Sequence, residues 1–392
     1  MRSPSTDPVG APLSAAFAVA DRERQLDGTR PVEGLRMRPG ERSEGARAPR
    51  PSGEEREGAG SGQARGYAPV TVDDAAFAHR PVMVDEVVAA LAPVPPGLFV
   101  DGTVGGGGHA AAVLGAHPGL DLLGLDRDPS ALDAARDRLA PFAPRVRLAR
   151  ARFDAIPELT AGAPVSAVLL DLGVSSPQLD RPGRGFSYRR PGPLDLRMDP
   201  SAALTAAEVV NSYPANRLAA LFRANGEGRY AHRIAAAIVA GRPFHDTVEL
   251  AETVRLAIPA SARRQGGHPA RRVFQALRIE VNAELDVLAA TLPPVLDLLA
   301  PGGRLAVIGY HSGEDRLVKA AFAAAASGGC TCPPGLPCVC GATPTHHLVF
   351  RGARRPSPAE VAENPRAESA RLRVVERIGV TGPDGGTWSG AA

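Results

Sequence analysis

A glycine-rich loop between an apolar run and a helical segment constrains this chain most. The apolar run 98–100 precedes Asp101, residues 105–108 are four consecutive glycines, and 110–114 reads as the opening of a helix. Glycine is needed where the backbone takes a positive φ or approaches a ligand closely, and the first N–H groups of a helix are unpaired. A strand, a tight turn and a helix start in this order predict a site for a nucleotide-like cofactor. A lone glycine-rich loop is weak evidence, because such loops also occur without a ligand.

Short apolar runs alternate with helical patterns after this loop. We expect strands at 98–100, 120–125, 146–148, 165–172 and 304–310, and a final antiparallel pair at 346–350 and 372–378. A proline pair, Pro293-Pro294, predicts a break within the helical stretch 274–299. The alternation predicts an α/β fold with a doubly wound, Rossmann-like sheet. Ligands of such folds bind beyond the carboxyl ends of the strands, where the glycine loop falls.

Acidic residues at the predicted strand ends narrow the choice of cofactor. Asp126 ends the second strand about 20 residues beyond the loop, where a carboxylate accepts hydrogen bonds from both hydroxyls of a ribose. Phe153 follows the third strand and can lie against an adenine, and Asp171 ends the fourth strand. Asp101 precedes the glycines, where its charge would repel phosphates and suit an ammonium group. The pattern therefore favours S-adenosylmethionine over NAD.

Several motifs after the fourth strand resemble those of one enzyme family. They are DLGVSSPQLD at 171–180, RGFS at 184–187, GPLDLRMD at 192–199, HPA at 268–270, FQALRI at 274–279, PGGRL at 301–305, HS at 311–312, EDR at 314–316 and AENPRA at 362–367. Over about residues 78 to 378 the chain is similar to the bacterial small-subunit rRNA cytosine-N4 methyltransferase H family, also called MraW. The family has a bulkier residue where Gly106 stands and a leucine where Gly313 stands.

The resemblance implies a class I S-adenosylmethionine-dependent methyltransferase fold with an inserted helical domain. It further implies methyl transfer to the exocyclic N4 of a cytidine in the decoding (P-site) region of 16S rRNA, with the small ribosomal subunit as partner. The family's cofactor contacts fall on positions that include those chosen above from strand ends, and we keep Asp101 beside them. The contacts are Gly107, Gly108, His109, Asp126, Phe153, Asp171 and Gln178.

Methylation of a cytosine amine requires mainly positioning by the protein. The N4 lone pair is delocalised into the ring, so acceptors for the amine hydrogens favour a more tetrahedral nitrogen aligned with the methyl group. Our candidates are Asp171, Ser175, Ser176 and the carbonyls of 174–177. The same segment can instead serve only to shape the cofactor pocket. The cytosine must also leave its stack to reach this pocket.

An arginine excess marks residues 181–275, which read as helices. This stretch holds 15 arginines against 7 acidic residues, a net charge of +8, whereas the whole chain is only +3. Lys319 is the single lysine of the chain, so a high arginine content is a general feature of its composition. The local excess of arginine over acidic residues is not explained by that general feature. We predict contacts to RNA phosphates, the alternative being a solvated basic surface. The candidates are Arg181, Arg184, Arg263, Arg264, Arg271 and Arg272, together with His311 at the end of the fifth strand.

The predicted organisation has five parts. They are a disordered extension at 1–75, the first part of the methyltransferase domain at 78–180, an inserted helical substrate-recognition domain at 181–272, the second part of the methyltransferase domain at 273–380 and a disordered tail at 381–392. The extension carries few large apolar side chains, so it cannot bury enough surface to offset its ordering entropy. With neither a membrane span nor a signal peptide in the pattern, we expect a cytoplasmic protein. A homodimer is compatible with the sequence, which does not fix the oligomeric state.

All four cysteines fall in two C-x-C pairs. Cys330, Cys332, Cys338 and Cys340 have the composition of a Cys₄ zinc site, although C-x-C is less usual than C-x₂-C. A cytoplasmic protein rarely keeps such cysteines as disulfides. A structural zinc ion is therefore one candidate for this loop, the alternative being four free thiols, and a metal assay on the purified protein distinguishes them.

Two other functions stay open at this point. One is a non-catalytic rRNA-binding or ribosome assembly factor on a methyltransferase scaffold, which the complete set of cofactor contacts disfavours. The other is an NAD-dependent oxidoreductase, for which the dinucleotide loop and a hydride-transfer dyad are lacking. Titration with S-adenosylmethionine and with NAD separates these functions.

Overall fold

The computed structural model describes residues 80–263, 268–333 and 337–379. The segments expected to be disordered, 1–75 and 381–392, lie outside these ranges, and so does Arg264. The side chains of Ser176 and Arg263 are likewise not among those described.

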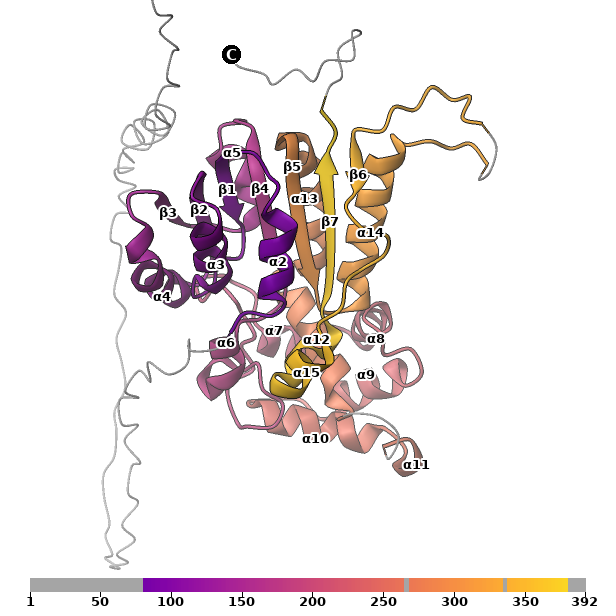
Figure 1. Cartoon of the computed structure of the whole chain (residues 1–392). Coiled ribbons are helices and arrows are strands. Elements are labelled where there is room, and N and C mark those ends of the chain that lie inside the picture. The colour runs from indigo at the N-terminus through magenta and orange to yellow at the C-terminus, as the bar shows by residue number, and fades with distance from the viewer. Residues whose placement is uncertain (1–79, 264–267, 334–336, 380–392) are drawn as a thin grey trace, which may run out of the picture. The chain divides into compact units, whose positions relative to one another are not determined.

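Seven strands form one mixed sheet (Figure 1). The strands are β1 Gly97–Asp101, β2 Leu120–Asp126, β3 Val146–Arg150, β4 Val165–Asp171, β5 Leu299–Gly309, β6 His346–Leu348 and β7 Arg371–Arg377. Their order is β3-β2-β1-β4-β5-β7-β6, with β1 to β5 parallel and β7 antiparallel to both of its neighbours. This order is typical of class I S-adenosylmethionine-dependent methyltransferases, which confirms the predicted fold class.

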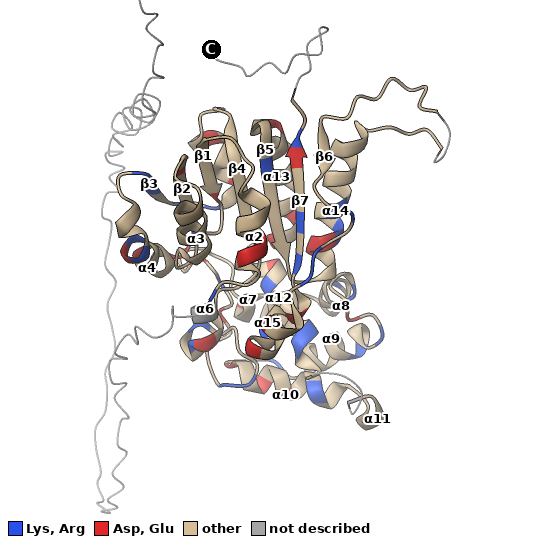
Figure 2. Cartoon of the chain, viewed as in Figure 1, with Lys and Arg blue, Asp and Glu red and all other residues tan. Residues whose placement is uncertain are grey.

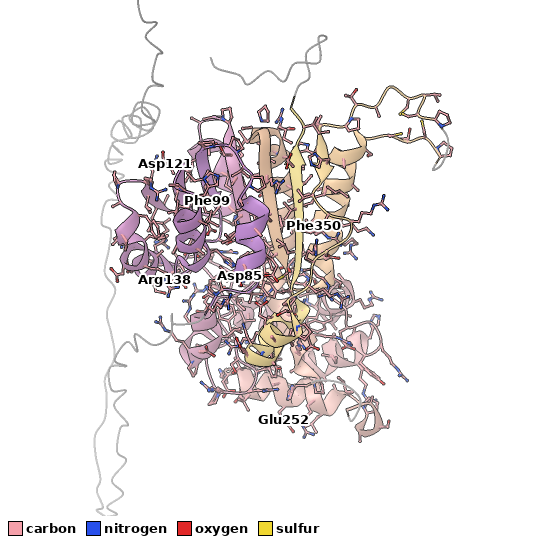
Figure 3. The ribbon with its side chains drawn as sticks, viewed as in Figure 1. Asp85, Phe99, Asp121, Arg138, Glu252 and Phe350 are labelled. Atoms are coloured by element: carbon pink, nitrogen blue, oxygen red, sulfur yellow. The ribbon has the colours of Figure 1, made fainter. Side chains whose placement is uncertain are left out.

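The sheet is covered on both faces, and the strand sequences explain why. Every residue of β4 except Asp171 is buried, as expected for a central parallel strand with helices on both sides. Phe99 in β1 is fully buried and packs in one cluster with residues of α2, α3 and α4 (Figure 3). Its neighbours in the strand point to the opposite face, because side chains alternate along a strand.

The helices that accompany the sheet lie before, between and after its strands. They are α2 Val84–Leu91, α3 Gly108–Ala116, α4 Pro129–Leu139, α5 Ile156–Leu159, α13 Glu284–Leu298, α14 Ser312–Ser327 and α15 Pro358–Glu363. Asp128 caps α4 by accepting a hydrogen bond from the N–H of Ser130, and Pro129 occupies the first turn, as the sequence predicts. None of the helices in the described part of the chain is long and apolar enough to cross a membrane.

A helical region is inserted between β4 and β5. It contains α6 Ser176–Asp180, α7 Ala206–Ser212, α8 Ala215–Ala224, α9 Ala231–Ala240, α10 Thr247–Ala257, α11 Ala260–Arg263 and α12 Ala270–Asn282. Buried side chains of α7 to α10 and α12 form a hydrophobic cluster distinct from the one that contains Phe99. The insertion therefore has a core of its own.

The expected break at Pro293-Pro294 is wrong. Both prolines lie inside α13, and the helical stretch is interrupted instead at Ala283, whose φ is 50°. The prolines have no N–H to offer to the carbonyls of Ala289 and Ala290. Both alanines are exposed, so water can satisfy these carbonyls. The helix continues because the missing bonds fall on its solvent side.

Candidate active site

A cavity of about 230 Å³ lies at the carboxyl ends of the parallel strands. Gly102 after β1, Asp126 at the end of β2, Asp171 at the end of β4 and Tyr310 after β5 all line it. Among the residues selected from the sequence, its lining includes Gly108, His109, Asp126, Phe153, Asp171, Ser175 and Gln178. Its lining does not include Asp101, Gly107, Arg181, Arg184, Arg271, Arg272 or His311.

The glycine loop connects β1 to α3 along one wall of the cavity. Gly107 has φ 77° and directly precedes α3, and a Cβ on it would lie 3.2 Å from Leu139 of α4. Gly108 lines the cavity, and a Cβ there would lie 2.5 Å from the Pro81 ring. A side chain at either position would strain this wall. Gly107 thus serves the packing of the loop, whereas Gly108 faces the cavity.

Asp126 is fixed by two backbone donors. Its Oδ2 accepts a hydrogen bond from the N–H of Gly105 at 3.0 Å, and its Oδ1 accepts one from the N–H of Asp128 at 2.9 Å. Burial raises the pKa of Asp126, while these two N–H groups act in the opposite direction. Each carboxylate oxygen has a second lone pair, so the group can still accept two ligand hydroxyls.

Asp101 lies beneath the cavity rather than on its surface. Its side chain is 1% exposed and accepts a hydrogen bond from the N–H of Thr103 at 3.1 Å. Burial first, and then the nearby Asp171 and Asp126 carboxylates, raise the pKa of Asp101 to about 8, against the lowering effect of the hydrogen bond from Thr103. At neutral pH the carboxyl group of Asp101 is therefore largely protonated. A neutral carboxyl group would not form an ion pair with the ammonium group of a cofactor.

Asp171, His109 and Tyr310 form a polar group on the cavity wall. The Tyr310 hydroxyl donates to Asp171 Oδ1 at 2.8 Å, and His109 Nδ1 lies 3.7 Å from Asp171 Oδ2. His109 Nε2 lies 2.9 Å from the Val82 carbonyl, which can only accept, so Nε2 carries the proton. His109 Nδ1 thereby faces the Asp171 carboxylate on the cavity wall.

The pKa values of this group follow from the same geometry. Burial raises the pKa of Asp171, against the lowering effects of His109 and of the Tyr310 hydrogen bond. Burial and the Asp171 charge raise the pKa of Tyr310 well above its ordinary value. Tyr310 therefore stays a hydrogen-bond donor to Asp171 across the physiological pH range.

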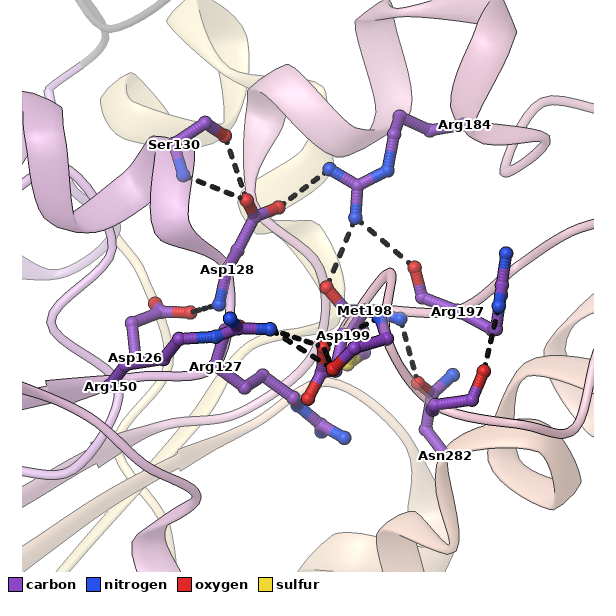
Figure 4. Close-up of polar contacts among 12 residues, drawn as sticks. Asp126, Arg127, Asp128, Ser130, Arg150, Arg184, Arg197, Met198, Asp199 and Asn282 are labelled. Carbon is purple, nitrogen blue, oxygen red and sulfur yellow. Dashed lines mark hydrogen bonds and ion pairs between the residues drawn. The ribbon is translucent and has the colours of Figure 1, made fainter.

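A buried ion pair joins the end of β2 to the inserted helices (Figure 4). Arg184 donates to Asp128 Oδ2 at 2.6 Å and to the carbonyls of Arg197 and Met198 at 3.1 and 3.0 Å. Burial would raise the pKa of Asp128, but the hydrogen bonds from Arg184 and Ser130 lower it overall. Arg184, which the sequence assigned to RNA phosphates, is 21% exposed, and its guanidinium is engaged by these protein acceptors.

Gln178 has both ends of its amide engaged by the protein. Its Nε2 donates to Asp128 at 3.3 Å, and its Oε1 accepts from the N–H of Ser175 at 3.1 Å. Gln178 therefore links the segment after β4 to the start of α4, at the edge of the cavity.

His311 caps α14 instead of facing the cavity. Its Nδ1 accepts from the N–H of Gly313 at 3.2 Å, and Glu314 Oε2 accepts from the N–H groups of Tyr310 and His311. Burial would raise the pKa of Glu314, but His311 and Arg278 lower it overall. Glu314 also lines the cavity, and the two hydrogen bonds that it accepts hold the turn that carries Tyr310. The predicted RNA contact at His311 stays a prediction.

Arginines recur on the inserted helices, notably α8, α9 and α10 (Figure 2). Arg271 and Arg272 at the start of α12 are exposed, and Arg272 lies 3.5 Å from Glu227. Arg181 is half-buried at the end of α6. Arg271 and Arg272 therefore leave their guanidinium groups at the surface, whereas Arg181 and Arg184 are both half-buried.

Sequence reasoning missed several cavity residues, among them Tyr310, Arg127 and Glu284. Tyr310 could have been predicted, because it directly follows the last residue of β5, and ligands of such sheets bind at the carboxyl ends of the strands. Arg127 also lines the cavity, and burial lowers its pKa. Glu284, 8% exposed and held by Arg278 at 2.8 Å, comes from α13, and no local motif indicated that this helix reaches the site.

Comparison with known proteins relates the whole described chain to one family. A family model described as the MraW methylase family matches residues 76–378. A ribosomal RNA small subunit methyltransferase H of Acidothermus cellulolyticus is 54% identical over 313 residues, which cover 77% of this chain and 94% of that protein. The protein of the same name from Heliobacterium mobile is 50% identical over 311 residues, which cover 77% of this chain and 99% of that protein.

A solved structure gives a weaker likeness. An rRNA methylase from Streptococcus thermophilus aligns with a TM-score of 0.32 at 12% identity, covering 75% of this chain and 95% of that chain. The family match therefore comes from the sequence and not from this superposition.

Proposed function

Because this chain belongs to the MraW methylase family, we propose that it is a small-subunit ribosomal RNA methyltransferase. Its reaction is the transfer of a methyl group from S-adenosylmethionine to the exocyclic N4 of a cytidine of 16S rRNA, in the decoding region. The family match over residues 76–378 carries this proposal. The enzyme acts in the cytoplasm on the small ribosomal subunit. The homodimer left open by the sequence is not part of the proposal.

The cavity fits S-adenosylmethionine in its chemistry. Asp126 keeps lone pairs for the two ribose hydroxyls after accepting its backbone bonds. Phe153 supplies an apolar surface at the same cavity, and Gly108 lets a ligand approach the backbone. When bound, the cofactor supplies an electrophilic methyl group on a sulfonium. The zinc ion predicted for the cysteine loop has no part in this reaction, because those cysteines do not line the cavity.

Asp171 is the residue that we place at the reacting amine. Its carboxylate accepts an N4 hydrogen, which favours a tetrahedral nitrogen whose lone pair points at the methyl group. Gain of the methyl group would leave the nitrogen cationic, and Asp171 or water at the cavity mouth would accept the proton that the nitrogen then releases. Tyr310 fixes the carboxylate, and Ser175 lies on the same cavity wall. Ser176 stays a candidate from the sequence alone.

The insertion supplies the proposed surface for RNA. Exposed arginines at its helix ends suit phosphates, and its attachment to β2 through Arg184 keeps it beside the cavity. A cytidine that has left its stack can then enter the cavity while flanking phosphates rest on the insertion.

The decisive test is methyl transfer to authentic substrate. Purified protein, labelled S-adenosylmethionine and small subunits from a strain that lacks the corresponding gene are incubated, and the digested 16S rRNA is analysed by mass spectrometry. We expect one N4-methylcytidine per subunit. Binding of the subunit without methyl transfer would instead support an assembly factor, and methylation of another nucleoside would contradict the proposed target.

A further inference from the structure

The four cysteines lie together in the loop between α14 and β6. This loop leaves the helix after Ser327 and enters the strand at His346, and its residues 334–336 are not described. None of the four thiols is in a disulfide. All of them are half-buried or exposed, so their proximity does not come from packing in a hydrophobic core.

The sulfur atoms are spaced like the corners of one coordination sphere. The distances are 3.4 Å for Cys330 to Cys338, 3.4 Å for Cys338 to Cys340, 3.6 Å for Cys330 to Cys340 and 4.0 Å for Cys332 to Cys338. A tetrahedral zinc ion with Zn–S bonds of about 2.3 Å sets its sulfur atoms roughly 3.8 Å apart. A disulfide would need about 2.05 Å, which no pair in this cluster approaches.

We propose that Cys330, Cys332, Cys338 and Cys340 bind one structural zinc ion. Four thiolates complete a tetrahedron and leave no open position for water or substrate, which is the mark of a structural site. The N–H of Val339 donates to Cys332 Sγ at 3.4 Å, and such bonds orient a thiolate ligand and balance its charge.

The loop itself explains why a metal is needed. Its apolar residue Val339 is 88% exposed, so burial of side chains contributes little to its order. Its two ends are tied to each other, because the N–H of Thr345 donates to the carbonyl of Ala325 at 3.2 Å. Between these ends, binding of the metal would supply the folding free energy that a small core cannot.

The position of the loop separates the zinc ion from the methyl transfer. β6 runs parallel to β5, since both are antiparallel to β7. His346 at the start of β6 pairs with Arg377, and the preceding residue Glu376 pairs with Arg304, whose partner Ala167 lies near the beginning of β4. The loop therefore enters at the amino ends of the parallel strands, opposite to the cavity, in the upper part of Figure 1. The proposed metal stabilises this edge of the sheet without touching the reaction.

The first experiment measures metal and thiols in the full chain. The protein is purified without chelators or metal-affinity resin, and zinc is quantified by mass spectrometry of the elements beside alkylation of the unreduced protein. We expect about one zinc per chain, with four thiols that react only after the metal is removed. Four free thiols without metal, two thiol pairs that react only after reduction, or bound iron would each overturn the proposal.

A matched pair of variants assigns the ligands. Cys338→Ser removes one ligand, whereas Val339→Ala alters the neighbouring exposed position and keeps all four. We expect Cys338→Ser to lose most of its zinc and to be cut faster by protease within 328–345, while Val339→Ala keeps both properties of the parent. S-adenosylmethionine binding stays unchanged in both, so failure of this test is separable from failure of the proposed methyltransferase function. Equal zinc content in both variants would overturn the assignment.

Discussion

At the scale of single residues, our proposal makes cofactor affinity depend most directly on Asp126. Asp126→Ala removes the proposed acceptor for the ribose hydroxyls and leaves the N–H groups of Gly105 and Asp128 without their partner. A hydrogen bond to a charged group is worth about 1.5–3 kcal/mol, so we expect binding of S-adenosylmethionine to weaken at least about tenfold. Isothermal titration calorimetry measures this change.

The control for Asp126 comes from the same strand. Asp121 lies near the amino end of β2, far along the strand from the cavity, and is labelled in Figure 3. Asp121→Ala should leave the affinity within about twofold of the parent, because it removes a carboxylate that does not line the cavity. Similar losses in both variants would mean that Asp126 acts through stability and not through the ribose.

The hydrogen bond from Tyr310 to Asp171 leads to a prediction about the pH dependence of kcat. Its hydroxyl donates to Asp171 and lowers the pKa of that carboxyl, so Tyr310→Phe raises the Asp171 pKa further. If the ionised Asp171 accepts the N4 hydrogen, activity is lost as the pH falls through its pKa, and the acid limb of the kcat profile moves to higher pH in the variant. We expect kcat at neutral pH to fall about tenfold, the effect of losing one hydrogen bond to a charged group.

The matched control is Tyr230→Phe, on the inserted helices, which should keep the parent profile. The titratable groups around Asp171 are His109, Tyr310, Glu314 and Asp101, and Tyr310→Phe changes only one of them. A Tyr310→Phe variant with lower kcat and an unshifted profile would argue that Tyr310 merely packs against the cavity.

The raised pKa of Asp101 leads to a prediction about how the free energy of unfolding depends on pH. Its folded pKa of about 8 exceeds its ordinary value of 3.8 because the side chain is buried. The folded state therefore holds a proton that the unfolded chain has released. This contribution to the free energy of unfolding is complete below the unfolded pKa and is lost as the pH rises toward 8, at roughly 1.4 kcal/mol per pH unit.

Asp101→Asn cannot ionise, and its amide oxygen can still accept the N–H of Thr103. Urea unfolding between pH 5 and 9 should thus show a flatter decline in the variant than in the parent. Part of the slope remains, because burial also raises the pKa values of Asp126 and Asp171. An identical slope in both proteins would show that Asp101 is ionised in the fold.

At the scale of elements, the ion pair between Asp128, just after β2, and Arg184 of the insertion links the two regions. Arg184→Met leaves Asp128, 3% exposed, without its cation and frees the carbonyls of Arg197 and Met198. Breaking a buried pair in this way costs about 3–5 kcal/mol. The exposed pair Arg255 with Glu252 gives the control, since Arg255→Met should cost at most about 0.5 kcal/mol. Urea unfolding compares the two.

Adding Asp128→Asn to Arg184→Met separates the structural role from an RNA contact. The double variant removes the unpaired charge and should recover part of the lost stability. If Arg184→Met lost RNA affinity but kept its stability, Arg184 would instead contact RNA phosphates, as the sequence predicted.

The elements also show what the sequence could and could not predict. Strand ends, the glycine loop and Asp126 were visible because periodicity and turn residues are local signals. The role of Arg184 was not, because its partner Asp128 is 56 positions away and only the fold brings them together. The expected break at Pro293-Pro294 failed for a related reason, since whether a helix tolerates proline depends on the exposure of Ala289 and Ala290, which is a tertiary property.

At the scale of the whole molecule, charge is distributed unevenly between the two regions. The chain carries a net charge of only +3, whereas residues 181–275 carry +8. Some of these arginines are committed internally, as Arg184 and Arg197 are. The part of the excess that remains at the surface is what an RNA backbone can use.

The final prediction concerns this surface. Arg271→Ala combined with Arg272→Ala removes two exposed guanidinium groups at the start of α12. If each contacts one phosphate, affinity for a 16S rRNA fragment falls and the slope of log K against log salt becomes shallower by roughly 0.7–0.9 per contact. Filter binding across a series of KCl concentrations measures both quantities, and Arg263→Ala with Arg264→Ala tests the pair that the sequence singled out. Arg136→Ala on α4 lies outside the insertion, with a side chain 65% exposed against 63% for Arg272, and should leave the slope unchanged. An unchanged slope in the Arg271 and Arg272 variant would mean that the charge excess of the insertion is only a solvated surface.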